Sequence, residues 1–184
     1  QAVGNMNIDV EKMKIDMLSL SGHKFYGPKG IGALYVKDGI KFDRFIDGGH
    51  QEKNKRAGTE NVPEIVGIGK AAELAKRNLY EHKKHLQELR DYYIEQVEKN
   101  IPNSKLNGSR KNRLPGNANF SFKDVDSNAI LYDLDLKGIC VSTGSACNSA
   151  EAGPSHVLRS IGLEEEWING SIRATFGDEN TKED

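Results

Sequence analysis

The sequence has few cysteines, no long apolar run and no excess of charge of one sign. Its two cysteines, Cys140 and Cys147, are too few for a disulfide framework, so a reducing, cytoplasmic location is expected. The longest stretch without a charged residue, 138–150, is rich in Ser, Gly and Asn and is shorter than the ~20 apolar residues of a membrane-spanning helix. The 26 Lys and Arg residues balance 27 Asp and Glu, which predicts no direct binding of nucleic acid or of an anionic membrane.

The 184 residues have the composition of a polar globular protein, with 29% charged and 36% hydrophobic side chains. This length allows one ordinary domain or two small ones. The chain opens at Gln1 with neither an initiator methionine nor the charged and apolar parts of a signal peptide. It closes at 181–184 with a helix-start signature that no helix follows. Two interpretations fit these ends, a disordered charged tail and a fragment truncated at both ends.

The first half of the chain is predicted to contain two strands and a long helix. Short apolar runs at 17–20 and 33–36 flank a glycine-rich turn and predict the strands. Residues 42–59 lack helical periodicity and predict a long loop. Apolar residues then recur at helical spacing over 61–100, beyond the usual length of a globular helix, so we expect a bend or break near 80–84.

A domain boundary at that break divides the chain into 1–80 and 81–184. The second part has a mixed pattern, and the predicted fold class is α/β. Asp126 is a candidate helix cap and Gly138 a helix stop. The predicted helices cover 127–137 and 154–161, and the predicted strands cover 119–122, 171–176 and a stretch beginning at 140–141.

A lysine in a glycine-rich turn is the first candidate for chemistry. Lys24 follows the first predicted strand and precedes a Gly-Pro-Lys-Gly turn. It could bind a phosphate as a point charge, or form a Schiff base with an aldehyde cofactor if burial or a neighbouring cation favours the neutral amine. Ser21 and His23 flank it and could hold a phosphate. The alternative is a surface turn with a solvated lysine.

Cys147 is the second candidate, because it lies in a polar loop, 142–150, rich in Ser and Gly. Free cysteines usually prefer the interior, so an exposed loop thiol suggests reactivity, although an incidental loop cysteine is the alternative. Cys140, flanked by Ile and Val, is interpreted as a small buried apolar residue. The spacings among Cys140, Cys147 and His156 do not match the close cysteine pairs of zinc sites, so no metal is predicted.

An arginine in an apolar, strand-like run is the third candidate. A fixed Arg173 guanidinium on a strand suits bidentate recognition of a carboxylate, although a surface or salt-bridged arginine is the alternative. The Gly67-Ile-Gly69 segment has the glycine spacing of a dinucleotide-binding fingerprint. It lacks the required structural context, because it lies inside a helical pattern with no strand before it. We interpret these small residues as a packing contact.

Four segments together resemble, in their order along the chain, the NifS/IscS group of cysteine desulfurases, which are class V, fold-type I pyridoxal-phosphate enzymes. They are Ser21–Gly30, Arg56–Thr59, Ser142–Cys147 and Ser171–Thr175. The resemblance runs along essentially the whole chain and covers only the later part of such an enzyme. It implies part of a fold-type I large domain before the boundary, joined by a long helix to a small α+β domain whose last helix is missing.

The resemblance implies a role for each residue of a cofactor site. Lys24 matches the lysine that binds pyridoxal 5'-phosphate as a Schiff base. Ser21 and His23 match the groups that hold the cofactor phosphate. Gln1 matches a glutamine that hydrogen-bonds the phenolic oxygen of the cofactor. Thr59 matches a residue that reaches the phosphate bound by the other subunit of a homodimer.

The resemblance also implies the substrate and the reaction. Arg173 matches the residue that binds the carboxylate of L-cysteine, and Cys147 matches the nucleophile that takes up its sulfur, leaving L-alanine and a persulfide. A mobile loop with Gly144 and Gly153 near its ends would carry this sulfur to an iron–sulfur scaffold protein or to other acceptors, including those of tRNA thiolation. The family's Gly-Gly-Gly run appears here as Gly-Gly-His50, and a spacer or surface role is expected for that histidine.

Two other functions remain open at this stage. The first is another class V enzyme, an aminotransferase or selenocysteine lyase, which needs Lys24 but not Cys147. The second is a non-catalytic fragment that only docks a sulfur acceptor. In this resemblance the aspartate that pairs the pyridine nitrogen lies before Gln1. We therefore expect the 184-residue chain alone to bind cofactor poorly and to be inactive.

Overall fold

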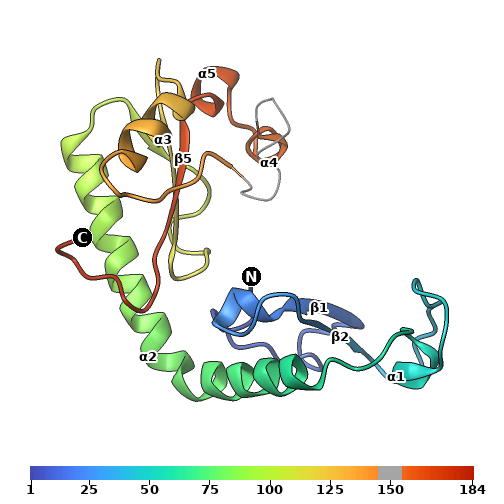
Figure 1. Ribbon diagram of the computed structural model, residues 1–184. Coiled ribbons are helices and arrows are strands. Elements are labelled where there is room, and N and C mark those ends of the chain that lie inside the picture. Colours follow the sequence, from blue (N-terminus) through green and yellow to red (C-terminus); the bar gives the residue numbers. More distant parts are fainter. Residues whose placement is uncertain (145–154) are drawn as a thin grey trace. The chain divides into compact units, whose positions relative to one another are not determined.

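The computed structural model describes residues 1–144 and 155–184 and has a mixed α/β architecture, as predicted (Figure 1). The described residues form two compact units, unit 1 (Gln1–Glu81) and unit 2 (His82–Asp184). Cys147 and most of its predicted mobile loop lie outside the described residues. Among the described helices, none combines the length and the apolar character that crossing a membrane requires.

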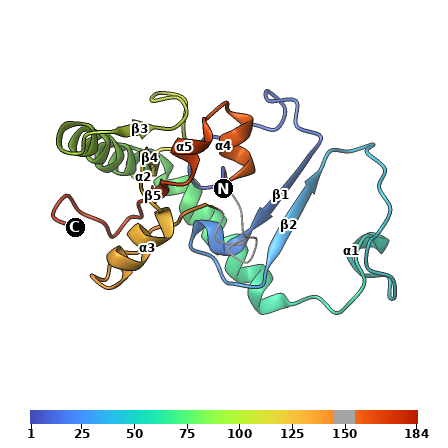
Figure 2. The same ribbon diagram turned by 90° about the horizontal axis from the view of Figure 1, so that it is seen from above.

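Unit 1 contains the two predicted strands, and they pair with each other. β1 (Met17–Ser21) and β2 (Gly32–Val36) run antiparallel, with a register from Met17 opposite Val36 to Ser21 opposite Gly32 (Figure 2). The 3₁₀ helix η1 (Gly22–Phe25) follows β1 directly, so part of the predicted glycine-rich turn is helical. The Gly22 N–H donates to the carbonyl of Ile31 at 2.9 Å and closes the loop between the strands.

The core of unit 1 joins η1 to the first half of the long helix α2 (Val62–Asn100). Phe25 of η1 is buried against Ile68 and Ala71 of α2. Gly67 of α2 faces the turn, because a Cβ there would lie 2.5 Å from Cγ of Pro28. This contact confirms the packing interpretation for Gly67, whereas a Cβ on Gly69 would meet no described atom within 4 Å. Partly buried apolar residues complete the cluster: Val3, Leu20, Ile31 and Ala75.

The predicted long loop is largely irregular, as expected. It contains the short helix α1 (Gln51–Asn54), in which Glu52 and Lys53 have positive φ values of 48° and 55°. Ala57 is buried, whereas Phe45 is 98% exposed. The segment therefore adds little to the core of unit 1.

The helix α2 continues through the region where we expected a bend or break. It is a single helix of 39 residues, so no break occurs, and the alternative that we expected, a bend, stays a prediction. His82, Lys83 and Lys84 interrupt the apolar face, but none of them is a glycine or proline, and all three can hold helical backbone angles. The apolar face resumes at Leu86 and Leu89, which are buried in unit 2.

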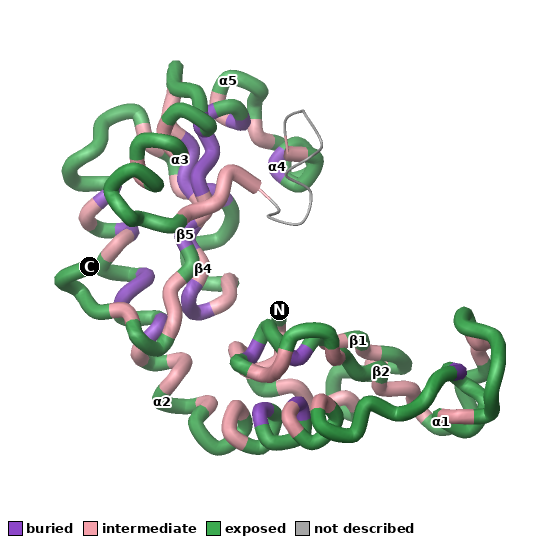
Figure 3. Tube along the Cα trace, viewed as in Figure 1, coloured by how far each residue is buried: buried purple, intermediate pink, exposed green. Residues whose placement is uncertain are grey.

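Unit 2 contains a three-stranded antiparallel sheet in the order β3 (Ser104–Leu106), β4 (Asn117–Phe122) and β5 (Ser171–Thr175). Ala118 and Phe120 of β4 pack on Ile94 and Val97 of α2. The ring of Tyr93 meets the edge of Phe120 at 5.9 Å between centroids. Figure 3 shows the buried stretches of β4 and β5 in purple. Sequence reasoning predicted the central strand β4 and its neighbour β5, and missed the short edge strand β3.

Three helices complete unit 2. α3 (Ser127–Asp135) begins where predicted, and its cap Asp126 accepts a hydrogen bond from the Asn128 N–H at 2.9 Å. Gly138, with a φ of 76°, follows its end. α4 (His156–Ser160) corresponds to the predicted short helix, and α5 (Glu165–Ile168) was not predicted.

Two expectations about residues 140–142 are wrong. The predicted strand at 140–141 does not form, and only an isolated bridge joins Ser142 to Arg173. Cys140 is exposed rather than buried. The reason is that the chain leaves α3 along the surface and meets β5 only at Ser142, so Cys140 has no sheet neighbour to cover it.

Candidate functional site

In unit 1, Lys24 lies on the outer side of η1. A 3₁₀ helix has three residues per turn, so residues three apart share a side. Gly22 and Phe25 take the buried side, and this leaves His23 and Lys24 facing outward. Tyr26 ends the turn in the left-handed conformation, with a φ of 63°. The local backbone therefore presents two adjacent polar side chains away from the core.

Close backbone contacts fix this turn. The Gly27 N–H donates to the Gly22 carbonyl at 2.9 Å. A Cβ on Gly27 would lie 2.9 Å from that carbonyl oxygen and 3.1 Å from Cβ of Ala71. A Cβ on Gly22 would lie 3.0 Å from both Ile31 and the Pro28 carbonyl. Only glycine fits both positions without a shift, so sterics set the path that carries Lys24.

The donors around Lys24 suit a phosphorylated aldehyde. Ser21, His23 and Lys24 are all exposed, and they offer a hydroxyl, an imidazole and an amine within four residues. In the described part of the chain, the Lys24 ammonium makes no hydrogen bond or ion pair, so the amine is available. Unit 1 by itself leaves this amine exposed. A Schiff-base lysine instead needs burial or a neighbouring cation that favours its neutral form.

The structure brings the start of the chain to this turn. Val3 belongs to the cluster around Phe25, and a Cβ on Gly4 would lie 3.0 Å from Cβ of Phe25. The carbonyl of Gln1 accepts a hydrogen bond from the Asn5 side chain at 3.0 Å. The exposed Gln1 is thereby held beside the element that carries Lys24.

Thr59 is exposed, and its conformation depends on the loop before it. Gly58 has a φ of 106°, and its N–H donates to Oε1 of Gln51 at 3.1 Å. Within unit 1, no hydrogen bond joins Thr59 to the Lys24 turn. His50, the departure from the family pattern, bonds Asn54 through Nδ1 at 2.6 Å on the surface.

In unit 2, Arg173 lies at the centre of β5, between two backbone neighbours. On one side it stands opposite Asn119 of β4. On the other, its N–H donates to the Ser142 carbonyl at 2.6 Å, and the Ser142 N–H donates to the Arg173 carbonyl at 3.1 Å. Its half-buried guanidinium makes no hydrogen bond or ion pair with any described residue. The backbone of Arg173 is thus fixed on both sides, and its guanidinium has donors open to a ligand.

The described start of the predicted reactive loop is tied to Arg173. The Ser142 hydroxyl donates to the Gly144 carbonyl at 2.9 Å, which shapes the first residues of that segment. Cys147 follows three residues beyond Gly144 and lies outside the described residues. Arg173 therefore lies next to the first residue, Ser142, of the segment that carries Cys147.

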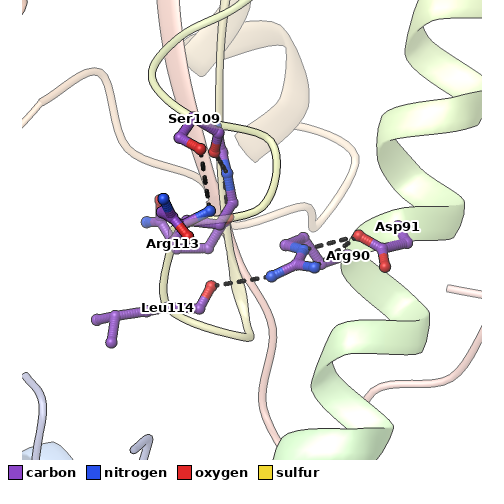
Figure 4. A network of polar contacts seen from close by, with 7 residues as sticks. Arg90, Asp91, Ser109, Arg113 and Leu114 are labelled. Carbon is purple, nitrogen blue, oxygen red and sulfur yellow. Dashed lines mark hydrogen bonds and ion pairs between the residues drawn. The ribbon is translucent and has the colours of Figure 1, made fainter.

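A second group of charged residues in unit 2 has a structural role. Arg90 pairs with Asp91 at 2.7 Å and donates to the Leu114 carbonyl, while Arg113 donates to the Ser109 carbonyl at 2.7 Å (Figure 4). Burial lowers the pKa of Arg113, and the charges of Arg90 and Arg110 add to this effect. These contacts fasten the loop before β4 to α2.

Sequence reasoning missed a set of buried and partly buried polar residues beside Arg173. Asn107, Asn119 and Ser171 are joined by side-chain hydrogen bonds on one face of the sheet. Their signal in the sequence is the alternation over 117–122, where polar residues alternate with Ala and Phe. Among the described residues, no group of three His, Cys, Asp or Glu side chains could hold a metal ion.

Comparison with known proteins identifies close relatives. The family described as Aminotransferase class-V matches residues 1–184. "Cysteine desulfurase IscS" of Clostridium botulinum is 54% identical over 186 residues and is matched by all of this chain, as is the protein of that name from Dictyoglomus turgidum at 54% over 184 residues. The chain spans about half the length of these curated relatives, 47% in both cases.

Solved structures show the same likeness. A structure titled "NIFS-LIKE PROTEIN" is 33% identical, with a TM-score of 0.88, and the match covers all of this chain and 46% of that one. The NifS-like protein from Rickettsia africae is 32% identical, also with a TM-score of 0.88, over 98% of this chain and 47% of that one. These two folds agree with the described units along essentially their whole length.

Proposed function

Since the chain belongs to the aminotransferase class-V family, we propose that it carries the reactive residues of a pyridoxal-phosphate-dependent cysteine desulfurase. The reaction converts L-cysteine to L-alanine and leaves the sulfur as a persulfide on Cys147. Similarity to proteins named cysteine desulfurase IscS and to NifS-like structures supports this proposal. The protein would then supply sulfur for iron–sulfur cluster assembly and tRNA thiolation.

The residues at η1 fit the proposed cofactor. The Lys24 amine is the group that would bond the aldehyde, and the Ser21 hydroxyl and His23 ring suit the phosphate. Gln1, held beside this turn, would hydrogen-bond the phenolic oxygen of the cofactor. Thr59 would contact the phosphate of the cofactor bound by the second subunit of a homodimer. Pyridoxal phosphate, when bound, withdraws electrons from the Cα of the amino acid.

Three side chains of this protein act on the substrate in the proposed reaction. The Arg173 guanidinium binds and orients the carboxylate of L-cysteine. The Lys24 amine takes the proton from Cα of the substrate. The Cys147 thiolate attacks the substrate sulfur, so that a sulfur–sulfur bond forms and the carbon–sulfur bond breaks. The carbon released from sulfur takes up a proton and becomes the methyl group of alanine.

A single observation carries the proposal beyond similarity. The backbone pair between Arg173 and Ser142 ties the carboxylate-binding arginine to the segment that carries Cys147. A nucleophile that must reach the sulfur of cysteine needs its segment to start close to the group that holds the carboxylate. This pairing supplies that proximity within unit 2.

We assign the two parts of the chain accordingly. In this proposal residues 1–80 belong to the cofactor-binding large domain, and residues 81–184 belong to a small domain joined to it by α2. The protein is proposed to act in the cytoplasm as a homodimer and to pass sulfur to a scaffold protein. Contact with nucleic acid or with a membrane is not part of the proposal.

Mass mapping of sulfur tests the function. The full-length protein that contains this chain is treated with L-cysteine, and the added mass of one sulfur is located by peptide mass spectrometry. We expect it on Cys147 and not on the exposed Cys140. Cys140→Ala is the matched control and keeps the activity, whereas Cys147→Ala loses it. Cysteine turnover retained by Cys147→Ala would instead indicate an aminotransferase or lyase of the same family.

A further inference from the structure

The sheet of unit 2 has one apolar face and one polar face. Ala118 and Phe120 of β4 pack on α2. Successive strand residues point to opposite faces, so Asn119 and Ser121 point away from α2. Ser171 and Arg173 of β5 stand opposite Ser121 and Asn119, and directly opposed residues of antiparallel strands share a face. Arg173 therefore emerges from the polar face.

Side-chain hydrogen bonds join the residues of this polar face. Asn107 donates through Nδ2 to Oδ1 of Asn119 at 2.6 Å and to Oγ of Ser121 at 2.8 Å. Asn119 donates in turn to Oγ of Ser171 at 3.3 Å. Asn107, Ser121 and Ser171 are at most 7% exposed. Buried polar groups without partners are costly, so these bonds hold the Asn119 amide in one orientation.

The register places that amide against Arg173. Both backbone polar groups of Arg173 bond Ser142, on the side of β5 that faces away from β4. The pair of Arg173 with Asn119 is therefore the non-hydrogen-bonded type of antiparallel pair, in which the Cα atoms approach to about 4.5 Å and the side chains lie closest. The Asn119 side chain flanks the stem of Arg173 on one side, and Ser142 flanks it on the other.

We propose that Asn119 is a positioning residue for Arg173. The partly buried amide of Asn119, held by Asn107 and Ser171, confines the arginine stem. It directs the guanidinium, which bonds no described residue, toward a substrate carboxylate beside Ser142. This inference rests on the proposed function, because it concerns the binding of L-cysteine. It assigns Asn119 no contact with the substrate.

Steady-state kinetics of the full-length protein test the inference. Asn119→Ala frees the stem of Arg173, and we expect the KM for L-cysteine to rise about threefold to tenfold, with kcat unchanged. Arg173→Ala removes a charged hydrogen-bond donor and should raise KM by about tenfold to a hundredfold. The double variant should show the KM of Arg173→Ala alone, because Asn119 acts only through the arginine.

Two further variants separate positioning from a merely structural role. Asn117→Ala is the matched control, since Asn117 lies on the same face of β4 but stands opposite Thr175, and its KM should equal that of the wild type. If Asn119→Ala does not fold, Ser171→Ala removes one partner of the amide with little change in volume, and it should raise KM about twofold to threefold.

The outcomes distinguish this inference from the function on which it rests. A full-length wild-type protein that releases no alanine from cysteine overturns both. A normal wild type whose Asn119→Ala and Arg173→Ala effects on KM multiply in the double variant overturns the inference alone. A fall in kcat at constant KM, or an equal effect of Asn117→Ala, does the same.

Discussion

The turn around Lys24 in unit 1 and the sheet around Arg173 in unit 2 hold their charged side chains by different means. In the turn, glycines allow backbone atoms to approach closely, and a Cβ on Gly27 would lie 2.9 Å from the Gly22 carbonyl oxygen. The side chain of Lys24 itself is exposed. In the sheet, the cross-strand register places the partly buried amide of Asn119 opposite Arg173, which is itself half-buried.

This difference teaches where each region is sensitive. A turn held by close packing responds to added volume, because no space exists for another methyl group. A sheet held by polar contacts responds to lost hydrogen bonds, because a freed side chain samples more orientations. Substitutions in the turn should therefore change stability, and substitutions in the sheet should change substrate binding.

The largest expected effect comes from removing the amine of the turn. Lys24→Ala removes the proposed proton acceptor and cofactor anchor, so alanine release from L-cysteine should fall by at least about 10²–10⁴-fold. The measurement is the initial rate with saturating cysteine and added cofactor. Lys29→Ala is the matched control, an exposed lysine of the same turn, and it should keep the wild-type rate. A Lys24→Ala protein with wild-type activity would contradict the role proposed for Lys24.

A pair of glycines in α2 tests the steric half of the comparison. A Cβ on Gly67 would lie 2.5 Å from Cγ of Pro28, whereas a Cβ on Gly69 meets no atom of the described residues within 4 Å. Gly67→Ala should lower the free energy of unfolding by about 1–3 kcal/mol, because it overpacks the contact with the turn. Gly69→Ala should raise it by about 0.5–1 kcal/mol, the usual gain of alanine in a helix.

Denaturant unfolding of the full-length protein measures both changes. The opposite signs are the essential result, because both substitutions add the same methyl group to the same helix. If Gly67→Ala and Gly69→Ala both stabilised the protein, the turn would be shown to accommodate the added methyl group. The steric account of the Lys24 turn would then be wrong.

The smallest expected effect concerns pH and the apolar face of the sheet in unit 2. Burial raises the pKa of Tyr93 above its ordinary value of 10.0. The unfolded chain then loses the phenol proton at a lower pH than the folded chain does. The stability from the neutral phenol is fully present below about pH 10 and is lost as the pH rises through the folded pKa.

Tyr93→Phe should remove this part of the alkaline loss, because it has no phenol to ionise and keeps the ring contacts with Phe120 and Phe176. Unfolding midpoints between about pH 8 and about pH 11 provide the measurement. Tyr92→Phe, the more exposed neighbour on α2, is the control and should follow the wild-type profile. Identical profiles for wild type and Tyr93→Phe would contradict the assignment.

Local patterns in the sequence predicted most of the regular structure. β1 and β2 follow from apolar runs on either side of a glycine-rich turn, and α3 begins at the cap Asp126, as expected. Of the bend or break that we expected in α2, the break does not occur, because three polar residues can interrupt an apolar face while the helix continues. The strand at 140–141 was wrong because a strand needs a partner along its length, and only Ser142 finds one.

The site was predicted less completely than the fold. The motifs singled out Lys24 and Arg173, and the structure shows what surrounds each of them within its own unit. Asn119 and its partners were not predicted, because asparagines and serines form no recognisable motif. Strand register decides which of them come into contact. Their bonds join positions that lie 12 and 52 residues apart along the chain. The roles proposed for all the site residues stay predictions: Gln1, Ser21, His23, Lys24, Thr59, Cys147 and Arg173.

The sequence by itself determined which residues can do chemistry here. The lysine among glycines and the order of four short segments resemble one enzyme family, and this resemblance predicts a class of reaction without coordinates. Only the tertiary structure decided that Arg173 stands between Asn119 and Ser142, and that Cys140 is exposed. Strand register and burial depend on contacts between distant parts of the chain, and no local pattern of residues encodes those contacts.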